Sequence, residues 1–185
     1  TGFYVLYYNK DIFDAAGVDY PGNDMTWTEF EELAKKVTSG EGNDKKYGAL
    51  FHTWQACVQN WAVQDGKHTI LDTDYSFMKP WYEEALALQK NGYIQDYATL
   101  KTANIHYTSV FKNQQCAMMP MGTWFIATMM QSHAAGETSF NWGIATIPHP
   151  ENTEAGYTVG ALTPIAISAF TDQKDLAWDF VKFAS

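Results

Sequence analysis

Short apolar runs alternate with helical patterns along the whole of this 185-residue chain. Five runs have the composition and length of strands: residues 1–8, 47–51, 116–121, 141–148 and 157–168. Helical patterns occupy the segments 9–17, 26–40, 54–66, 77–91, 107–113, 124–132 and about 171–185. Strands that alternate with helices predict an α/β fold, in which helices cover a sheet.

The clearest helix signal is a capping box, formed by Thr26 and by Glu29 three residues later, before a run of apolar residues at helical spacing. Neither end of the chain has the signals that usually begin or end a domain. The first residues already have a strand pattern, and the last ones have a helical pattern without a stop signal. We therefore expect this sequence to be a segment of a longer protein.

The charge of the chain argues against two classes of partner. Acidic residues number 21 and basic residues 12, for a net charge of −9, and no basic cluster occurs. Nucleic acids and anionic membrane surfaces both attract positive charge, so neither is an expected partner. No apolar run reaches the length of a membrane-spanning helix.

The cysteines and histidines do not form a recognisable site. Cys57 and Cys116 are the only cysteines and lie far apart, so a disulfide and two buried free thiols both remain open. The five histidines include no pair at the spacing of helical metal ligands. We expect neither a metal nor a cofactor.

Acidic side chains do not form a pair suited to catalysis. The glutamates at 31–32 and 83–84 are adjacent on helical patterns, and adjacent helical residues do not face each other. Asp65 and Asp96 lie near element ends and have no partner in the sequence pattern. A nucleophile elbow, a P-loop and a dinucleotide fingerprint are all absent. We expect no enzyme, and keep a secreted carbohydrate-active hydrolase or a structural surface domain as the alternatives.

The segment Gly122-Thr123-Trp124 connects the strand at 116–121 to the following helix. In α/β folds, ligands bind at the carboxyl ends of strands, where helix N-termini offer free N–H groups. A tryptophan there can present its flat face to the C–H face of a sugar. Core packing is the alternative role for such a ring. The aromatic content of 16% exceeds what a core of this size needs, which favours ligand stacking.

Six motifs occur in a fixed order: 7–17, 26–30, 47–48, 111–118 with 122–124, 147–150 and 177–183. Together they resemble the family 1 extracellular solute-binding proteins of sugar ABC importers, the family that includes maltose-binding protein. The resemblance implies a two-lobed, periplasmic-binding-protein-like α/β fold, present here mostly as the C-terminal lobe, with a mixed sheet flanked by helices.

The function that this resemblance implies is the binding of a sugar or oligosaccharide between two lobes. The bound ligand is delivered to the transmembrane subunits of an ABC permease. The implied location is extracytoplasmic, either periplasmic or as a lipoprotein on the surface of a one-membrane bacterium. By the same resemblance, residues 1–8 form the strand of a hinge crossing and 9–160 the second lobe. Residues 161–185 form the return crossing plus a strand and helix of an incomplete first lobe.

The resemblance assigns ligand contacts at three places in the chain. The assigned residues are Gly122 and Trp124, the loop residues His52, Trp54 and Gln55, and Gly160 and Ala161 at the return crossing. The two small residues allow backbone to approach a ligand closely. Helical spacing places Trp54 at the start of the 54–66 pattern, facing the cleft, and places Trp61 in the core.

Overall fold

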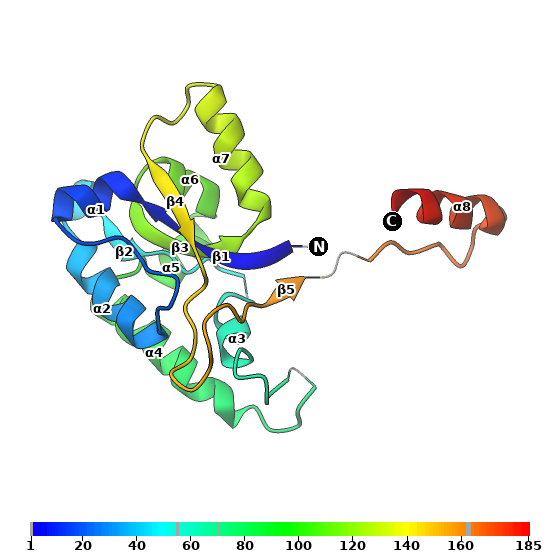
Figure 1. Cartoon of the computed structure of the whole chain (residues 1–185), viewed down its shortest axis with the longest axis horizontal. Coiled ribbons are helices and arrows are strands. Elements are labelled where there is room, and N and C mark those ends of the chain that lie inside the picture. The colour runs from blue at the N-terminus through cyan, green and yellow to red at the C-terminus, as the bar shows by residue number, and fades with distance from the viewer. Residues whose placement is uncertain (1, 55, 70, 162–163) are drawn as a thin grey trace.

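One mixed sheet runs through the centre of the computed structural model, which describes residues 2–54, 56–69, 71–161 and 164–185 (Figure 1). Its strands are β1 (Gly2–Asn9), β2 (Tyr47–Ala49), β3 (Cys116–Gly122), β4 (Trp142–Ala145) and β5 (Gly160–Ala161). The order is β2-β3-β1-β4, and β5 pairs with the start of β1. β2 is parallel to β3, whereas β3, β4 and β5 are antiparallel to β1.

Helices cover both faces of this sheet. They are α1 (Lys10–Ala16), α2 (Trp27–Val37), α3 (Ala56–Ala62), α4 (Lys79–Lys90), α5 (Tyr97–Thr102), α6 (Tyr107–Lys112), α7 (Trp124–Ala134) and α8 (Lys174–Ala184), with 3₁₀ turns η1 (Gly42–Asp44) and η2 (Ser76–Met78). The predicted capping box begins α2: the Thr26 hydroxyl accepts from the Glu29 N–H, and the Glu29 carboxylate accepts from the Thr26 N–H at 2.8 Å. The α/β prediction is confirmed.

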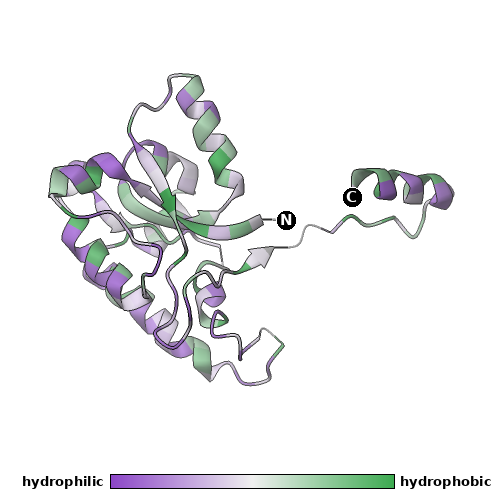
Figure 2. Cartoon of the chain, in the orientation of Figure 1, coloured by the Kyte–Doolittle hydropathy of each residue, from purple (hydrophilic) through white to green (hydrophobic). Residues whose placement is uncertain are grey.

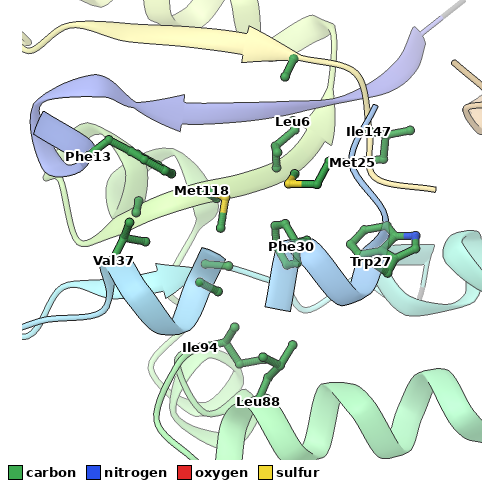
Figure 3. Close-up of a cluster of buried hydrophobic side chains, with 14 of the residues drawn as sticks. Leu6, Phe13, Met25, Trp27, Phe30, Val37, Leu88, Ile94, Met118 and Ile147 are labelled. Atoms are coloured by element: carbon green, nitrogen blue, oxygen red, sulfur yellow. The ribbon is translucent and has the colours of Figure 1, made fainter. Parts of the chain in front are cut away.

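Two hydrophobic cores, one on each face of the sheet, hold the helices in place. Side chains of β1 alternate between them: Leu6 belongs to the core with α2 and α4, and Tyr7 to the core with α5, α6 and α7. Figure 3 shows Leu6 and Met118 projecting from the sheet toward Phe30 of α2, with Leu88 beyond that helix. Because both faces are covered, β1 and β3 are nearly continuous apolar runs.

Several predicted boundaries were wrong for identifiable reasons. Among the described residues of the strand predicted at 157–168, only Gly160–Ala161 form a strand, and they pair with Phe3 and Gly2 of β1. Residues 164–168 have no ladder partner and are coil. Helix α3 begins at Ala56, so Trp54 precedes it rather than opening it. The sequence missed α5 because its six residues bury only Leu100, which leaves no apolar stripe to detect.

Both cysteines are free thiols in the interior. Cys57 lies in α3, and Cys116 begins β3 in the core shared with α6 and α7. Burial raises the pKa of Cys57 to about 12, which keeps this thiol protonated. Of the two possibilities that the sequence left open, the structure therefore has two buried thiols rather than a disulfide.

Helix α8 lies apart from the sheet and its covering helices, beyond the segment that follows β5 (Figure 1). It has no buried residue, although hydrophobic positions such as Leu176, Phe180 and Phe183 recur along it (Figure 2). This helix therefore has an apolar face without a partner in the described part of the chain. Within the same described ranges, no helix is long and apolar enough to cross a membrane.

Gly48 of β2 is a position where the packing of α2 on the sheet demands glycine. A Cβ atom there would overlap the carbonyl oxygen of Ala34 in α2. We predict that Gly48→Ala lowers the free energy of unfolding by about 1–3 kcal/mol, because backbone must move to accommodate the methyl group. Urea unfolding of the full-length protein measures this. Gly22→Ala is the control, since a Cβ at Gly22 meets nothing within 4 Å; equal stability losses in both variants would refute the packing argument.

Candidate ligand-binding site

Trp124, the first residue of α7, is held against the sheet by two glycines. Its six-membered ring lies so close to Gly122 that a Cβ there would overlap it, and a Cβ on Gly2 of the neighbouring strand would lie 2.8 Å from the ring. The antiparallel β1–β3 ladder pairs Gly122 with Tyr4, and Gly2 lies two residues before Tyr4 on the same strand. The Tyr7 hydroxyl donates to the Gly122 carbonyl at 2.9 Å, and the Thr123 N–H donates to the Phe3 carbonyl at 2.9 Å. The strand-to-helix turn is thus fixed on both sides.

Other aromatic rings surround Trp124 without covering it. Its indole N–H donates to the Tyr107 hydroxyl at 3.2 Å, and its ring meets Tyr4 edge-on with centroids 5.6 Å apart. The Trp54 ring lies 6.1 Å from the Trp124 ring, centroid to centroid. Trp124 is 38% exposed and Trp54 is 41% exposed, whereas Trp61 is 2% exposed. The prediction that Trp61 belongs to the core is confirmed, and the two exposed rings form a shared aromatic surface.

His52 lies beneath this surface as a neutral side chain. Its ring is buried and packs edge-on against Trp54, with centroids 4.8 Å apart, and against Tyr107 at 5.0 Å. Desolvation, reinforced by the nearby His106 and Lys101, lowers its pKa from 6.5 to about 4. Its Nδ1 atom is buried and has no hydrogen-bond partner in the described part of the chain. The imidazole therefore has spare hydrogen-bonding capacity.

The return segment meets the same end of the sheet. Gly160 pairs with Phe3 and Ala161 with Gly2, the glycine that also supports the Trp124 ring. Gln55 lies outside the described residues. The fold thus brings together Trp124, Gly122, Trp54 and His52, and it adds the backbone of Gly160 and Ala161.

Sequence reasoning missed Tyr107, His106 and Tyr4, which complete this cluster. Tyr107 begins α6 as Trp124 begins α7, and His106 is the N-cap of α6. That shared position at a helix start was visible in the sequence. The convergence of the two helix starts depends on tertiary packing, which the sequence pattern did not show.

The carboxylates considered as catalytic groups both serve local structure. Asp65 accepts hydrogen bonds from the backbone N–H groups of Lys67 and His68, and its other oxygen lies 2.6 Å from the His68 ring. Asp96 caps α5 by accepting from two backbone N–H groups. Across the described ranges, no three His, Cys, Asp or Glu side chains gather as a metal-binding group. What the site offers is aromatic surface and hydrogen-bonding groups.

This arrangement agrees with the comparison to known families. The model of the bacterial extracellular solute-binding proteins matches residues 1–185. The chain belongs to this family. Its members are binding proteins rather than enzymes, so the predicted family and the expectation of no enzyme are both confirmed, and nothing supports the hydrolase alternative.

Individual relatives agree on the fold and differ in their named ligands. The sn-glycerol-3-phosphate-binding periplasmic protein of Brucella abortus is 26% identical over 98% of this chain and 42% of its own length. The structure of a sugar transporter from Rhizobium etli in an open conformation is 51% identical, with a TM-score of 0.86 over 99% of this chain and 47% of its own. A substrate-binding protein of Listeria monocytogenes in complex with cycloalternan is 22% identical, with a TM-score of 0.75 over 100% of this chain and 46% of its own.

These comparisons confirm the two-lobed periplasmic-binding-protein-like fold class. The chain spans less than half the length of these relatives. The 185 residues therefore correspond to part of the two-lobed fold.

The buried neutral histidine predicts a pH dependence of stability. Between about pH 4 and 6.5 the unfolded chain binds a proton at His52 that the folded chain does not. The free energy of unfolding therefore falls as the pH decreases through this range. His52→Phe should remove roughly 2 kcal/mol of the loss between pH 7.5 and pH 5.

Urea unfolding of the full-length protein at both pH values measures this effect. His133→Gln, which changes an exposed histidine of α7, is the control and should retain the wild-type dependence. If His52→Phe and wild type lost equal stability on acidification, His52 would not be the neutral buried group described.

Proposed function

We propose that this chain is part of the extracytoplasmic solute-binding component of an ABC importer, and that it binds a sugar or oligosaccharide. The observation that carries the proposal is the pair of half-exposed rings, Trp124 and Trp54, at the mouth of a strand-to-helix turn. Sugars present apolar C–H faces and a ring of hydroxyls. The rings supply stacking surface, the Tyr107 hydroxyl already bonds the Trp124 indole, and the Gly160–Ala161 backbone lies at the same end of the sheet; these groups would supply hydrogen bonds.

The surface around Trp124 and Trp54, which would form one wall of the binding cleft, suits an uncharged ligand better than the sn-glycerol-3-phosphate named for the Brucella relative. All 12 basic residues of the chain are lysines. Arginine, whose planar fork pairs with two phosphate oxygens, is absent from this sequence. The residues assigned to ligand contact are aromatic, small or neutral. A neutral saccharide therefore matches the chemistry of the wall more closely than glycerol phosphate does.

The second wall of the binding cleft belongs, in this proposal, to another lobe. Residues 1–8 form the hinge crossing, 9–160 the second lobe, and 161–185 the return crossing with a strand and helix of the first lobe. Support comes from β5, which pairs with β1 beside the site, and from α8, whose apolar residues have no partner in the described chain. Closure of two lobes over a sugar removes water from the stacked rings.

The proposed partners follow from membership in this family. The sugar-loaded protein would dock on the transmembrane subunits of an ABC permease, at the outer face of the cytoplasmic membrane. We place the protein in the periplasm or, in a one-membrane bacterium, on the cell surface as a lipoprotein.

Trp124→Ala tests the proposed site. In the full-length protein, we predict that this change weakens binding of the cognate saccharide by about 1–3 kcal/mol, because an anchoring aromatic is lost. Titration calorimetry measures the affinity. Tyr20→Ala is the control, because Tyr20 has similar exposure but contacts Tyr8 and Phe13 at the far end of β1. Unchanged affinity in a folded Trp124→Ala variant would remove Trp124 from the site.

Hydrogen exchange tests the proposed lobe boundary. An exposed large apolar side chain forgoes roughly 1.5–3 kcal/mol relative to a buried one. The amides of α8 should therefore exchange rapidly in the isolated 185-residue chain, or be protected only when the chain self-associates. They should be protected in the full-length protein. Equal protection of α8 and β2 in a monomeric isolated chain, as judged by light scattering, would mean that the boundary is misplaced.

A further inference from the structure

Gln64, two residues after the end of α3, is a buried polar side chain that joins distant segments of the chain. Its carbonyl oxygen accepts a hydrogen bond from the Trp27 indole N–H at 2.9 Å. Its amide nitrogen donates to the Pro148 carbonyl at 3.0 Å and to the Tyr157 carbonyl at 3.2 Å. Both ends of the amide are therefore satisfied, as its 4% exposure requires.

The partners of Gln64 come from different parts of the fold. Trp27 begins α2, Pro148 follows β4, and Tyr157 lies shortly before β5. The chain between β4 and β5 passes beside α3, which brings these two backbone carbonyls within reach of Gln64 (Figure 1). A buried amide or carbonyl without a partner is destabilising, so Gln64 favours the structure in which Tyr157 stays at this place.

The return segment, residues 157–161, is also held to β1. The Thr158 hydroxyl donates to the Tyr4 carbonyl at 2.6 Å, and the Tyr4 N–H donates to the Val159 carbonyl at 3.0 Å. Strand β5 then pairs with the first two residues of β1. Gln64 therefore fixes the start of the return segment, and β1 fixes the rest.

Tyr4 connects this segment to the candidate ligand-binding site. Its ring meets Trp124 edge-on with centroids 5.6 Å apart, and it meets Trp61 edge-on at 5.8 Å. The Trp61 ring in turn lies 4.9 Å from that of Trp27, which donates to Gln64. A shift of the return segment would therefore disturb Tyr4, which supports the Trp124 ring.

We propose that Gln64 and Thr158 form an anchor that holds the return segment to this lobe, so that residues 157–161 move with the lobe as one body when the two lobes open and close. Gln64 and Thr158 are then positioning residues for lobe closure. Hinge motions are absorbed by a few residues that can change their backbone angles, and a hydrogen-bonded segment resists such changes. This inference rests on the proposed two-lobed binding function and concerns how its closure is directed.

Hydrogen exchange of the full-length protein without ligand, followed by NMR, tests the anchor. Gln64→Met removes the amide at similar side-chain length, and Thr158→Val removes a hydroxyl at nearly the same shape. The reference is the Leu50 amide, which donates to the Met118 carbonyl at 2.9 Å in the centre of the sheet. We expect the exchange rate of the Tyr4 amide, relative to that of Leu50, to rise roughly tenfold in each variant, because local opening becomes easier.

The distance between the lobes supplies a second measurement. Spin labels at Lys101→Cys in α5 and Lys182→Cys in α8 report it, since the proposed function assigns α8 to the first lobe. We expect a broader distribution of label-to-label distances in both anchor variants than in the labelled wild type. Thr153→Val is the matched control, because the Thr153 hydroxyl donates to the Pro150 carbonyl at 2.9 Å before the return segment begins.

The control should keep the wild-type exchange ratio and the wild-type distances. Unchanged exchange ratios and distances in Gln64→Met and Thr158→Val would overturn the proposal. Equal acceleration of the Tyr4 and Leu50 amides would also overturn it, because the two residues would then support overall stability alone. Neither measurement uses a sugar, so the result is independent of the ligand assignment, which Trp124→Ala tests.

Discussion

The antiparallel ladder between β1 and β3 is the interaction on which the rest of the structure depends. It places Leu6 and Tyr7 of β1 in opposite cores, and so anchors helices on both faces of the sheet. At its end, the ladder pairs Gly122 with Tyr4, and both Gly122 and Gly2, two residues before Tyr4, leave room for the Trp124 ring. Trp124 occupies that room because neither glycine has a side chain. The geometry that stabilises the fold therefore also creates the exposed aromatic surface that we propose as the sugar site.

The elements that sequence analysis predicted correctly are those defined by local interactions. The capping box and apolar spacing of α2 lie within one stretch of chain, and Trp124 lies two residues after the last residue of β3. The elements that it missed depend on distant partners or carry few buried side chains. The extent of β5 is set by its pairing with residues at the start of β1. Helix α5 has a single buried residue and hence no periodic signal.

The candidate site likewise combines residues that sequence motifs predicted with residues that only tertiary packing brings there. Trp124, Gly122, Trp54 and His52 were predicted from motif order, and the fold brings them together. Tyr107 and Tyr4 were not predicted, because their contacts with Trp124 arise from the docking of α6 and β1. The low pKa of His52 likewise follows from its burial among these rings. Sequence motifs identified the ends of elements, and packing determined which ends meet.

The most direct test of the account is whether a bound saccharide touches the Trp124 ring. The indole N–H signal of Trp124, assigned by its loss in Trp124→Phe, is followed by ¹⁵N NMR in the full-length protein during titration with the best-binding saccharide. The account predicts a large shift of this signal at saturation, because its donor bonds Tyr107 within the site. A Trp124 signal that stays unchanged at saturation, while signals elsewhere shift, would contradict the assignment of this surface as the sugar site.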